Sequence, residues 1–274
     1  MVIQHNIAAI NSYRNLSTNQ NALSKNLEKL SSGYKINRAG DDAAGLAISE
    51  TMRSQINGLN QAVNNANDAV GLIQTAEGAM TETHSMLQRM KTLTTQAANG
   101  TYTATARNNI KAEIDALNSE ITRIATTTEF NGETPLNPAK KGKNLTFFIG
   151  ASANNTNQMT VAQQTMTANA LSIDKIGVDS TDKAFKAMAS VDAAIEKVSS
   201  YRATLGAAQN RLEHTVNNLK VTSENITSAE SRIRDTDMAD EITAYTKNNI
   251  LLQAAQSMLS QSNAMPQGVL SMLQ

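Results

Sequence analysis

Two long segments with heptad spacing of apolar residues, one in each half of the chain, constrain the fold more than any other feature. Apolar residues that recur in alternating steps of three and four are typical of long packed helices. Each segment covers about six heptads, so each helix would be roughly 60 Å long at ~1.5 Å per residue. The first seam comprises Ile56, Leu59, Val63, Ala66, Val70, Ile73, Met80 and Leu87, and the second comprises Val191, Ile195, Val198, Leu205, Leu212, Val216, Leu219, Ile226 and Ile233.

The composition argues against several classes of protein. Aromatic residues make up 3% of the 274 residues and Trp is absent, so a thick aromatic core is not expected. The formal net charge is zero, so neither nucleic acid nor an anionic membrane surface is an expected partner. The lack of Cys excludes disulfides and thiolate metal sites. With neither a secretory signal pattern nor an apolar stretch of ~20 residues, we expect no membrane insertion and, if the protein leaves the cell, no cleaved signal.

Both ends of the chain also carry apolar residues at helical spacing. Termini normally fray unless something docks on them, so apolar helices at both ends indicate a partner. Pairing with each other is the simpler alternative, but it would leave the wider C-terminal face exposed, as is typical of an interaction surface. The N-terminal set is Ile3, Ile7, Ile10, Tyr13, Leu16, Leu23, Leu27, Leu30 and Tyr34, and the C-terminal set is Ile242, Tyr245, Ile250, Leu251, Leu252, Ala255, Met258, Leu259, Val269, Leu270, Met272 and Leu273.

Between the two heptad segments, the pattern predicts a third helix over residues 110–124. It also predicts a loop and hairpin region over residues 130–173, with strands at 145–149 and 159–161. The first heptad segment has a second, Ala-rich apolar stripe, which indicates that its helix packs on two neighbouring helices. Polar residues that interrupt the seams are expected to fix register by pairing across the bundle, and these are Glu77, His84, Arg202, Gln209, Ser223 and Glu230. The predicted fold is mainly α: a long antiparallel helical bundle or coiled coil formed by the N- and C-terminal segments, with a small β-hairpin region in the middle.

The sequence predicts no catalytic, metal or cofactor site. His5, His84 and His214 are far apart in sequence and lack the spacing of metal ligands. The acidic residues within 235–241 lack the glycine and the spacing of a calcium loop. Asp41 and Asp42 precede an apolar stretch, where capping of a helix is their expected role. We therefore expect that the chain is not an enzyme.

Five stretches of the sequence resemble bacterial flagellins. They lie in the family's order along nearly the whole chain, and several are long enough to make chance agreement implausible. The family's large, variable outer domains are absent, so the chain resembles a minimal flagellin. The stretches are MVIQHNIAAINSYRNL at the start, LSSGYKINRAGDDAAGLAIS from residue 30, NDAVGLIQTAEGAM from residue 67, ENITSAESRIRDTDMADE from residue 224 and NAMPQGVLSMLQ at the end.

The resemblance implies an extracellular structural subunit that polymerises with itself into the helical flagellar filament and serves motility. Residues 1–43 with 235–274 would form an inner terminal coiled-coil domain, and residues 44–234 an outer helical domain that includes the hairpin region. The connections between these layers would contain Arg38, Asp41, Asp42, Arg234, Asp235 and Asp237. The helix for polymerisation and chaperone binding would contain Ile250, Leu251, Leu252, Met258, Leu259, Val269, Leu270, Met272 and Leu273.

The resemblance also implies partners. Flagellins are exported unfolded by the flagellar type III apparatus, are held by a dedicated export chaperone, and meet filament cap and hook-junction proteins. Toll-like receptor 5 recognises the family, and the matching positions here are Arg89, Leu93 and Glu113. Lys91-Thr92 stands where the family usually has Arg-Glu, and Thr94-Thr95 where it has Ala-Val, so the arginine is kept and an acidic neighbour is lost.

Three other functions are alternatives. A hook–filament junction protein shares terminal features with flagellin, but residues 30–49 and 233–241 resemble the filament subunit more closely. An enzymatic flagellin would carry a catalytic insert such as a zinc-peptidase helix, and residues 130–173 contain no histidine. A cytosolic coiled-coil scaffold would be retained inside cells.

Overall fold

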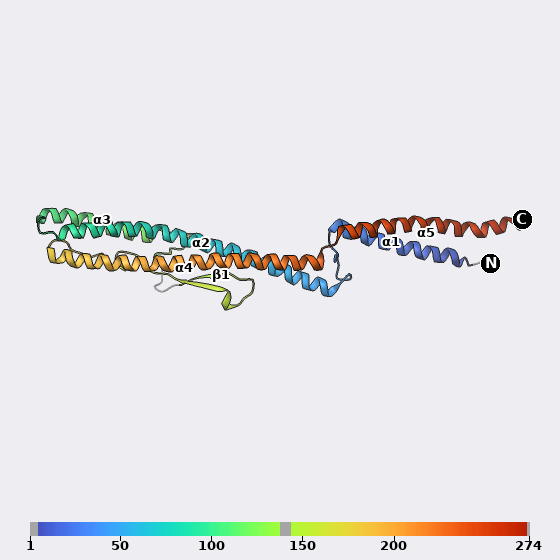
Figure 1. Ribbon diagram of the computed structural model, residues 1–274, viewed down its shortest axis with the longest axis horizontal. Helices are drawn as coiled ribbons and strands as arrows, with labels where there is room; N and C mark the ends of the chain where they lie inside the picture. The colour runs from blue at the N-terminus through green and yellow to red at the C-terminus, as the bar shows by residue number, and fades with distance from the viewer. Residues whose placement is uncertain (1–4, 138–143, 273–274) are drawn as a thin grey trace. The chain divides into compact units, whose positions relative to one another are not determined.

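Long helices account for most of the protein, as the sequence predicts. The computed structural model describes residues 5–137 and 144–272 (Figure 1). The helices are α1 (Ile7–Ser32), α2 (Ala43–Ala98), α3 (Ala104–Thr127), α4 (Thr181–Arg234) and α5 (Met238–Met272). Two strands, β1 (Asn144–Phe148) and β2 (Gln158–Ala162), flank a short 3-10 helix, η1 (Asn155–Asn157). The predicted third helix and hairpin are both confirmed.

The chain forms two compact units. The terminal unit comprises Met1–Ser54 with Glu224–Gln274, and the central unit comprises Gln55–Ser223. The division predicted after residues 43 and 234 lies close to helix ends, whereas the two compact units divide after residues 54 and 223. Its assignment to filament layers stays a prediction.

Local side-chain contacts explain where several helices begin and end. The side chain of Asn6 accepts a hydrogen bond from Ala9 N at 3.0 Å and caps the start of α1. Gly33 ends α1 in a left-handed conformation with φ of 75°, which glycine adopts without the strain of a Cβ. At α2 the Asp42 carboxylate accepts from Gly45 N at 2.9 Å, which confirms the capping role expected of Asp42. The same expectation is wrong for Asp41, whose carboxylate accepts from Asn37 N and Arg38 N before the helix begins.

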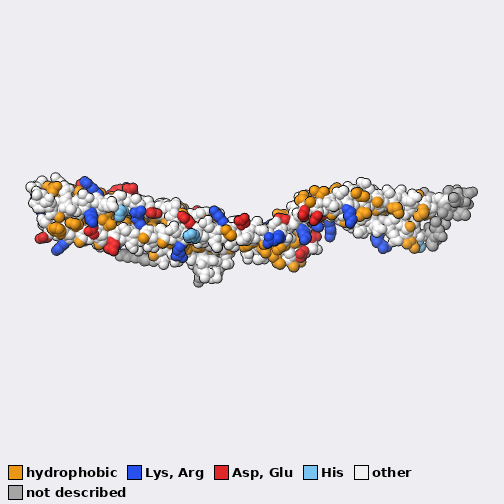
Figure 2. Space-filling model, viewed as in Figure 1, with side chains coloured by type: hydrophobic (Ala, Val, Ile, Leu, Met, Phe, Trp, Pro, Cys, Tyr) orange, Lys and Arg blue, Asp and Glu red, His pale blue; other side chains and the backbone are white. Residues whose placement is uncertain are grey.

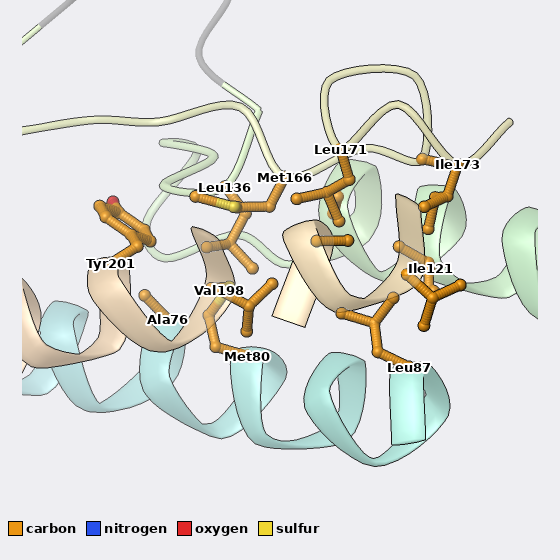
Figure 3. Packing of buried hydrophobic residues seen from close by; sticks show 14 of the residues in the cluster. Ala76, Met80, Leu87, Ile121, Leu136, Met166, Leu171, Ile173, Val198 and Tyr201 are labelled. Carbon is orange, nitrogen blue, oxygen red and sulfur yellow. The ribbon is translucent and has the colours of Figure 1, made fainter. Parts of the chain in front are cut away.

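The core of the central unit lies where α2, α3 and α4 meet the segment that connects α3 to α4. Figure 3 shows Met80 and Leu87 of α2 pointing toward Val198 of α4 and Ile121 of α3. Members of both predicted stripes of α2 are buried, which confirms that this helix packs on more than one neighbour. From the connecting segment, the core receives Leu136, Met159, Val161, Met166, Leu171 and Ile173.

Some of the polar residues in the seams pair across the bundle. In the central unit, Arg202 pairs with Glu77 at 3.5 Å, and Ser223 donates to Asn60 Oδ1 at 3.2 Å. Within the terminal unit, Glu230 pairs with Arg53 at 3.3 Å. His84 and Gln209 differ, because each pairs with a residue one turn away on its own helix. These two side chains therefore fix no register between helices.

The hairpin is held on α2 by small and polar residues. Its strands are antiparallel, with Phe147 opposite Met159 and Leu145 opposite Val161. The Asn65 side chain donates to Phe148 O at 3.0 Å. At Gly58 an added Cβ would lie 3.0 Å from the Cβ of Ala151, so a larger residue there would push the hairpin loop away. The alternation of β2 places Met159 and Val161 in the core.

We predict that Leu87→Ala lowers the free energy of unfolding by about 2–5 kcal/mol, because Leu87 is fully buried and its removal leaves a cavity. Urea denaturation followed by circular dichroism measures this. The control is Val221→Ala on α4, where Val221 is 57% exposed and the loss should be within about 0.5 kcal/mol. Equal losses in the two variants would contradict the packing described above.

Candidate functional site

The candidate site is the surface of the terminal unit rather than a pocket. Across residues 5–137 and 144–272, no group of three or more His, Asp or Glu side chains is arranged to hold a metal ion. The acidic cluster at the start of α5 has a structural explanation, because the Asp237 carboxylate accepts hydrogen bonds from Ala239 N at 2.9 Å and Asp240 N at 3.4 Å. None of the described helices is long and apolar enough to cross a membrane.

The helices α1 and α5 pair along the terminal unit around a buried amide. Asn26 is the one buried residue in α1, with 8% of its surface exposed. With its amide oriented to satisfy both ends, Asn26 donates to Glu241 Oε1 at 3.0 Å and accepts from Tyr245 N at 3.2 Å and from Asn248 Nδ2 at 3.0 Å. A buried amide that must meet polar partners specifies one register and orientation of a helix pair.

Two further polar contacts extend along the same pair. Lys29 Nζ lies 3.6 Å from Glu241 Oε2, close to Asn26. Near the start of α1, Asn6 Nδ2 donates to Ser262 O at 2.8 Å. Because partners early in α1 meet residues late in α5, the two helices are antiparallel, as the sequence predicts.

Apolar side chains remain exposed on both helices. On α1, Ile7 and Tyr13 are each 64% exposed, and on α5, Ile250 and Met258 are each 61% exposed. Figure 2 shows hydrophobic side chains gathered along the visible face of this unit. Exposed apolar area of this extent is typical of a surface that another protein covers. We call it the terminal apolar surface, and its exposed members are Ile7, Ile10, Tyr13, Leu27, Met238, Ile242, Ile250, Leu251, Met258 and Met265.

The predicted polymerisation helix lies in α5, and its residues differ in exposure. Ile250, Leu251 and Met258 are exposed, whereas Leu252 and Leu259 are half-buried. Val269, Leu270 and Met272 belong to α5, although their side chains lie outside what the structure describes. Leu273 also lies outside the described residues.

The two connections of the terminal unit meet through their backbones. Tyr34 and Asp235 form an antiparallel bridge, and Lys35 N donates to Arg234 O at 2.6 Å. The guanidinium carbon of Arg234 lies 4.9 Å from the centroid of the Tyr34 ring, and that of Arg53 lies 5.8 Å from it. Such cation–π contacts are worth about 0.5–2 kcal/mol each.

The charged residues predicted in these connections do not pair with one another. Arg38 pairs with Glu28 of α1 at 2.9 Å, and Arg234 pairs with Glu50 of α2 at 2.6 Å. The Asp41 carboxylate accepts from the N–H groups of Arg38 and Asn37, and these bonds hold the pKa of Asp41 below its ordinary value. The position of Tyr34 between two arginines is not predictable from the sequence pattern, because that arrangement depends on the backbone bridge.

The three receptor-contact candidates lie in the central unit. Arg89 of α2 and Glu113 of α3 form an ion pair at 2.8 Å, with 55% and 43% of their side-chain surfaces exposed. Leu93 is 2% exposed and belongs to the core. The two charged side chains are thus accessible together, whereas Leu93 supports the helix beneath them.

The fold and this surface define a class: a structural protein built for association between helices. Residues 3–141 match the bacterial flagellin N-terminal helical region, and residues 188–273 match the bacterial flagellin C-terminal helical region. The chain belongs to the bacterial flagellin family. It is a structural subunit of the extracellular flagellar filament, which serves motility.

Individual relatives agree with this assignment. Flagellin of Bacillus subtilis (strain 168) is 51% identical over 306 residues, and the flagellar filament 33 kDa core protein of Treponema phagedenis is 47% identical over 288 residues; both alignments cover 100% of each chain. The crystal structure of Bacillus cereus flagellin is 30% identical with a TM-score of 0.50, and the match covers 61% of this chain and 94% of that one. A putative flagellar hook-associated protein from Vibrio parahaemolyticus shares the fold at 11% identity, with a TM-score of 0.60 and coverage of 71% and 100%.

We predict that Asn26→Val weakens the α1–α5 pair by about 1–3 kcal/mol, because it leaves the partners of the amide unsatisfied. The concentration of free subunit in equilibrium with filaments should rise by about tenfold for each 1.4 kcal/mol lost. Sedimentation of the filaments measures that concentration. Asn21→Val at an exposed position of α1 is the matched control, and an equal rise in both variants would show that the amide has no special role.

Proposed function

We propose that the α1–α5 pair forms the inner layer of the filament and that neighbouring subunits cover the terminal apolar surface. The supporting observation is the contrast between the two units: the central unit has a continuous apolar core, whereas the described apolar side chains of α1 and α5 are at most half-buried. A helix pair that buries so little of its apolar surface gains stability when a partner covers the exposed residues. Residues 1–43 with 235–274 would thus form the inner domain, and 44–234 the outer one.

We further propose that the terminal helices order on assembly and leave the cell unfolded through the flagellar type III apparatus. The small apolar surface buried between α1 and α5 supports ordering on assembly, because segments that bury little apolar surface alone commonly fold on binding. Before export, α5 would lie in an apolar groove of a dedicated chaperone, with Ile250, Leu251 and Met258 as anchors. The filament cap and hook-junction proteins would meet the same helices at the filament ends.

We also propose that Toll-like receptor 5 recognises the central unit. The paired and exposed side chains of Arg89 and Glu113 would present charge to the receptor. Leu93, being buried, would act by holding α2 in place. The hook-associated protein shares only the fold with this chain, so it does not favour the junction-protein alternative.

Deleting residues 269–274 should weaken or abolish polymerisation, because it removes the last apolar residues of α5. Electron microscopy of the purified protein after seeding or salting out tests this without involving export. A paired test at one residue is Ile250→Asn, compared with Val221→Asn in the central unit, where the original side chains are 61% and 57% exposed. Normal filaments from both the truncated chain and Ile250→Asn would refute the inner-layer proposal.

Arg89→Ala should reduce receptor activation, because it removes the exposed arginine of the pair with Glu113. Activation of a reporter cell line that expresses the receptor, titrated with monomeric protein, measures this. Lys111→Ala serves as the control, because Lys111 is likewise an exposed cation of a surface ion pair, with Asp115 at 2.6 Å. Equal activation by Arg89→Ala and the unmodified protein would remove Arg89 from the contact.

A further inference from the structure

Among the methionines whose side chains the structure describes, the exposed ones lie on one helix. Of the ten methionines with described side chains, the three that are exposed all lie on α5, where Met238, Met258 and Met265 are 45%, 61% and 50% exposed. In the central unit the methionines are buried or half-buried. Met80, Met90, Met159 and Met166 are between 0% and 4% exposed.

The position of these residues joins them to the terminal apolar surface. Met258 and Met265 are one heptad apart, and Leu251, which is 40% exposed, is one heptad before Met258. Residues at this spacing lie on the same side of a helix, so the three form one exposed apolar row along α5. Met238 stands at the start of the same helix. Methionine is flexible and adapts its shape to different partners, which suits a row that would meet a chaperone first and other subunits later.

Sulfur chemistry in this chain rests on methionine alone. The sequence has neither Cys nor Trp, so the thioethers are its most readily oxidised side chains. Oxidation of methionine follows exposure, and among the methionines with described side chains Met258 and Met265 are the most exposed.

We propose that Met238, Met258 and Met265 form a reversible oxidation site that controls assembly of the free subunit. Hydrogen peroxide transfers one oxygen atom to each thioether, the sulfur loses two electrons, an S=O bond forms as the O–O bond breaks, and water is released. A methionine sulfoxide reductase with a dithiol reverses the step, producing water and the disulfide of the dithiol. The sulfoxide is polar and accepts hydrogen bonds, so it opposes burial of the apolar row against a neighbouring subunit.

This inference rests on the proposed function of α5, and it separates two states of the protein. In the free subunit the three sulfurs are open to peroxide. In the filament, the neighbours that cover the row would shield them. Oxidation would therefore block subunits that have not yet assembled and spare those that have.

The test treats purified subunits with hydrogen peroxide, locates the sulfoxides by peptide mass spectrometry and then scores polymerisation by electron microscopy. We expect sulfoxide at the three positions, loss of polymerisation, and recovery after incubation with methionine sulfoxide reductases and dithiothreitol. The variant Met238→Leu/Met258→Leu/Met265→Leu should assemble untreated, because Leu replaces Met at nearly constant volume, and should still assemble after peroxide treatment. Met52→Leu/Met86→Leu/Met188→Leu is the matched control, in which half-buried methionines are replaced and sensitivity to peroxide should persist.

Two outcomes would overturn the proposal: normal polymerisation of subunits that carry sulfoxide at the three positions, or unchanged sensitivity of the first triple variant. The rate of oxidation in preformed filaments tests separately whether neighbouring subunits shield α5. If peroxide oxidised the three methionines as fast in filaments as in free subunits, the shielding of α5 in the filament would be wrong. The effect of oxidation on free subunits would be judged independently of that result.

Discussion

The scarcity of apolar burial between α1 and α5 governs the rest of the structure. A helix pair whose buried centre is the amide of Asn26 gains orientation from polar contacts but little free energy from the hydrophobic effect. Leucines of both helices are only half-buried between them, and other apolar residues of the pair are exposed. The central unit has the opposite character, with a core that includes α2, α3, α4 and their connections. One chain thus combines a unit with a continuous apolar core and a unit whose apolar residues remain largely exposed.

The segments that follow α1 and α4 orient the α1–α5 pair without a large buried area. The bridge between Tyr34 and Asp235 uses backbone groups, which are present whatever the side chains are. The Tyr34 ring then lies beside the guanidinium groups of Arg53 and Arg234, each of which also pairs with a glutamate. Such a network fixes the exits of α1 and α4 with short-range contacts that do not require a large buried area.

Periodicity was sufficient to predict the helices and the hairpin, because heptads and alternation report which face of an element is buried. The same reasoning found that Glu77, Ser223 and Glu230 would pair across helices. It did not identify the partners of Arg38 and Arg234, since several opposite charges stand within reach in sequence and only the folded turns select among them. Asn26 was also missed. Because Asn is frequent in this chain, an Asn at an apolar position of a helix does not by itself indicate a buried amide.

The loop between the two strands of the hairpin is a place where residues can be inserted. Its strands are fixed by Met159 and Val161 in the core and by Asn65 on α2, whereas residues 152–154 in the loop between the strands are exposed. A loop anchored on both sides by packed strands tolerates added length, because the entropy of closing a loop grows slowly with the number of residues. A foreign peptide spliced between Ser152 and Asn154 would be repeated once per subunit, which makes the polymer a regularly spaced display lattice for antigens or enzymes.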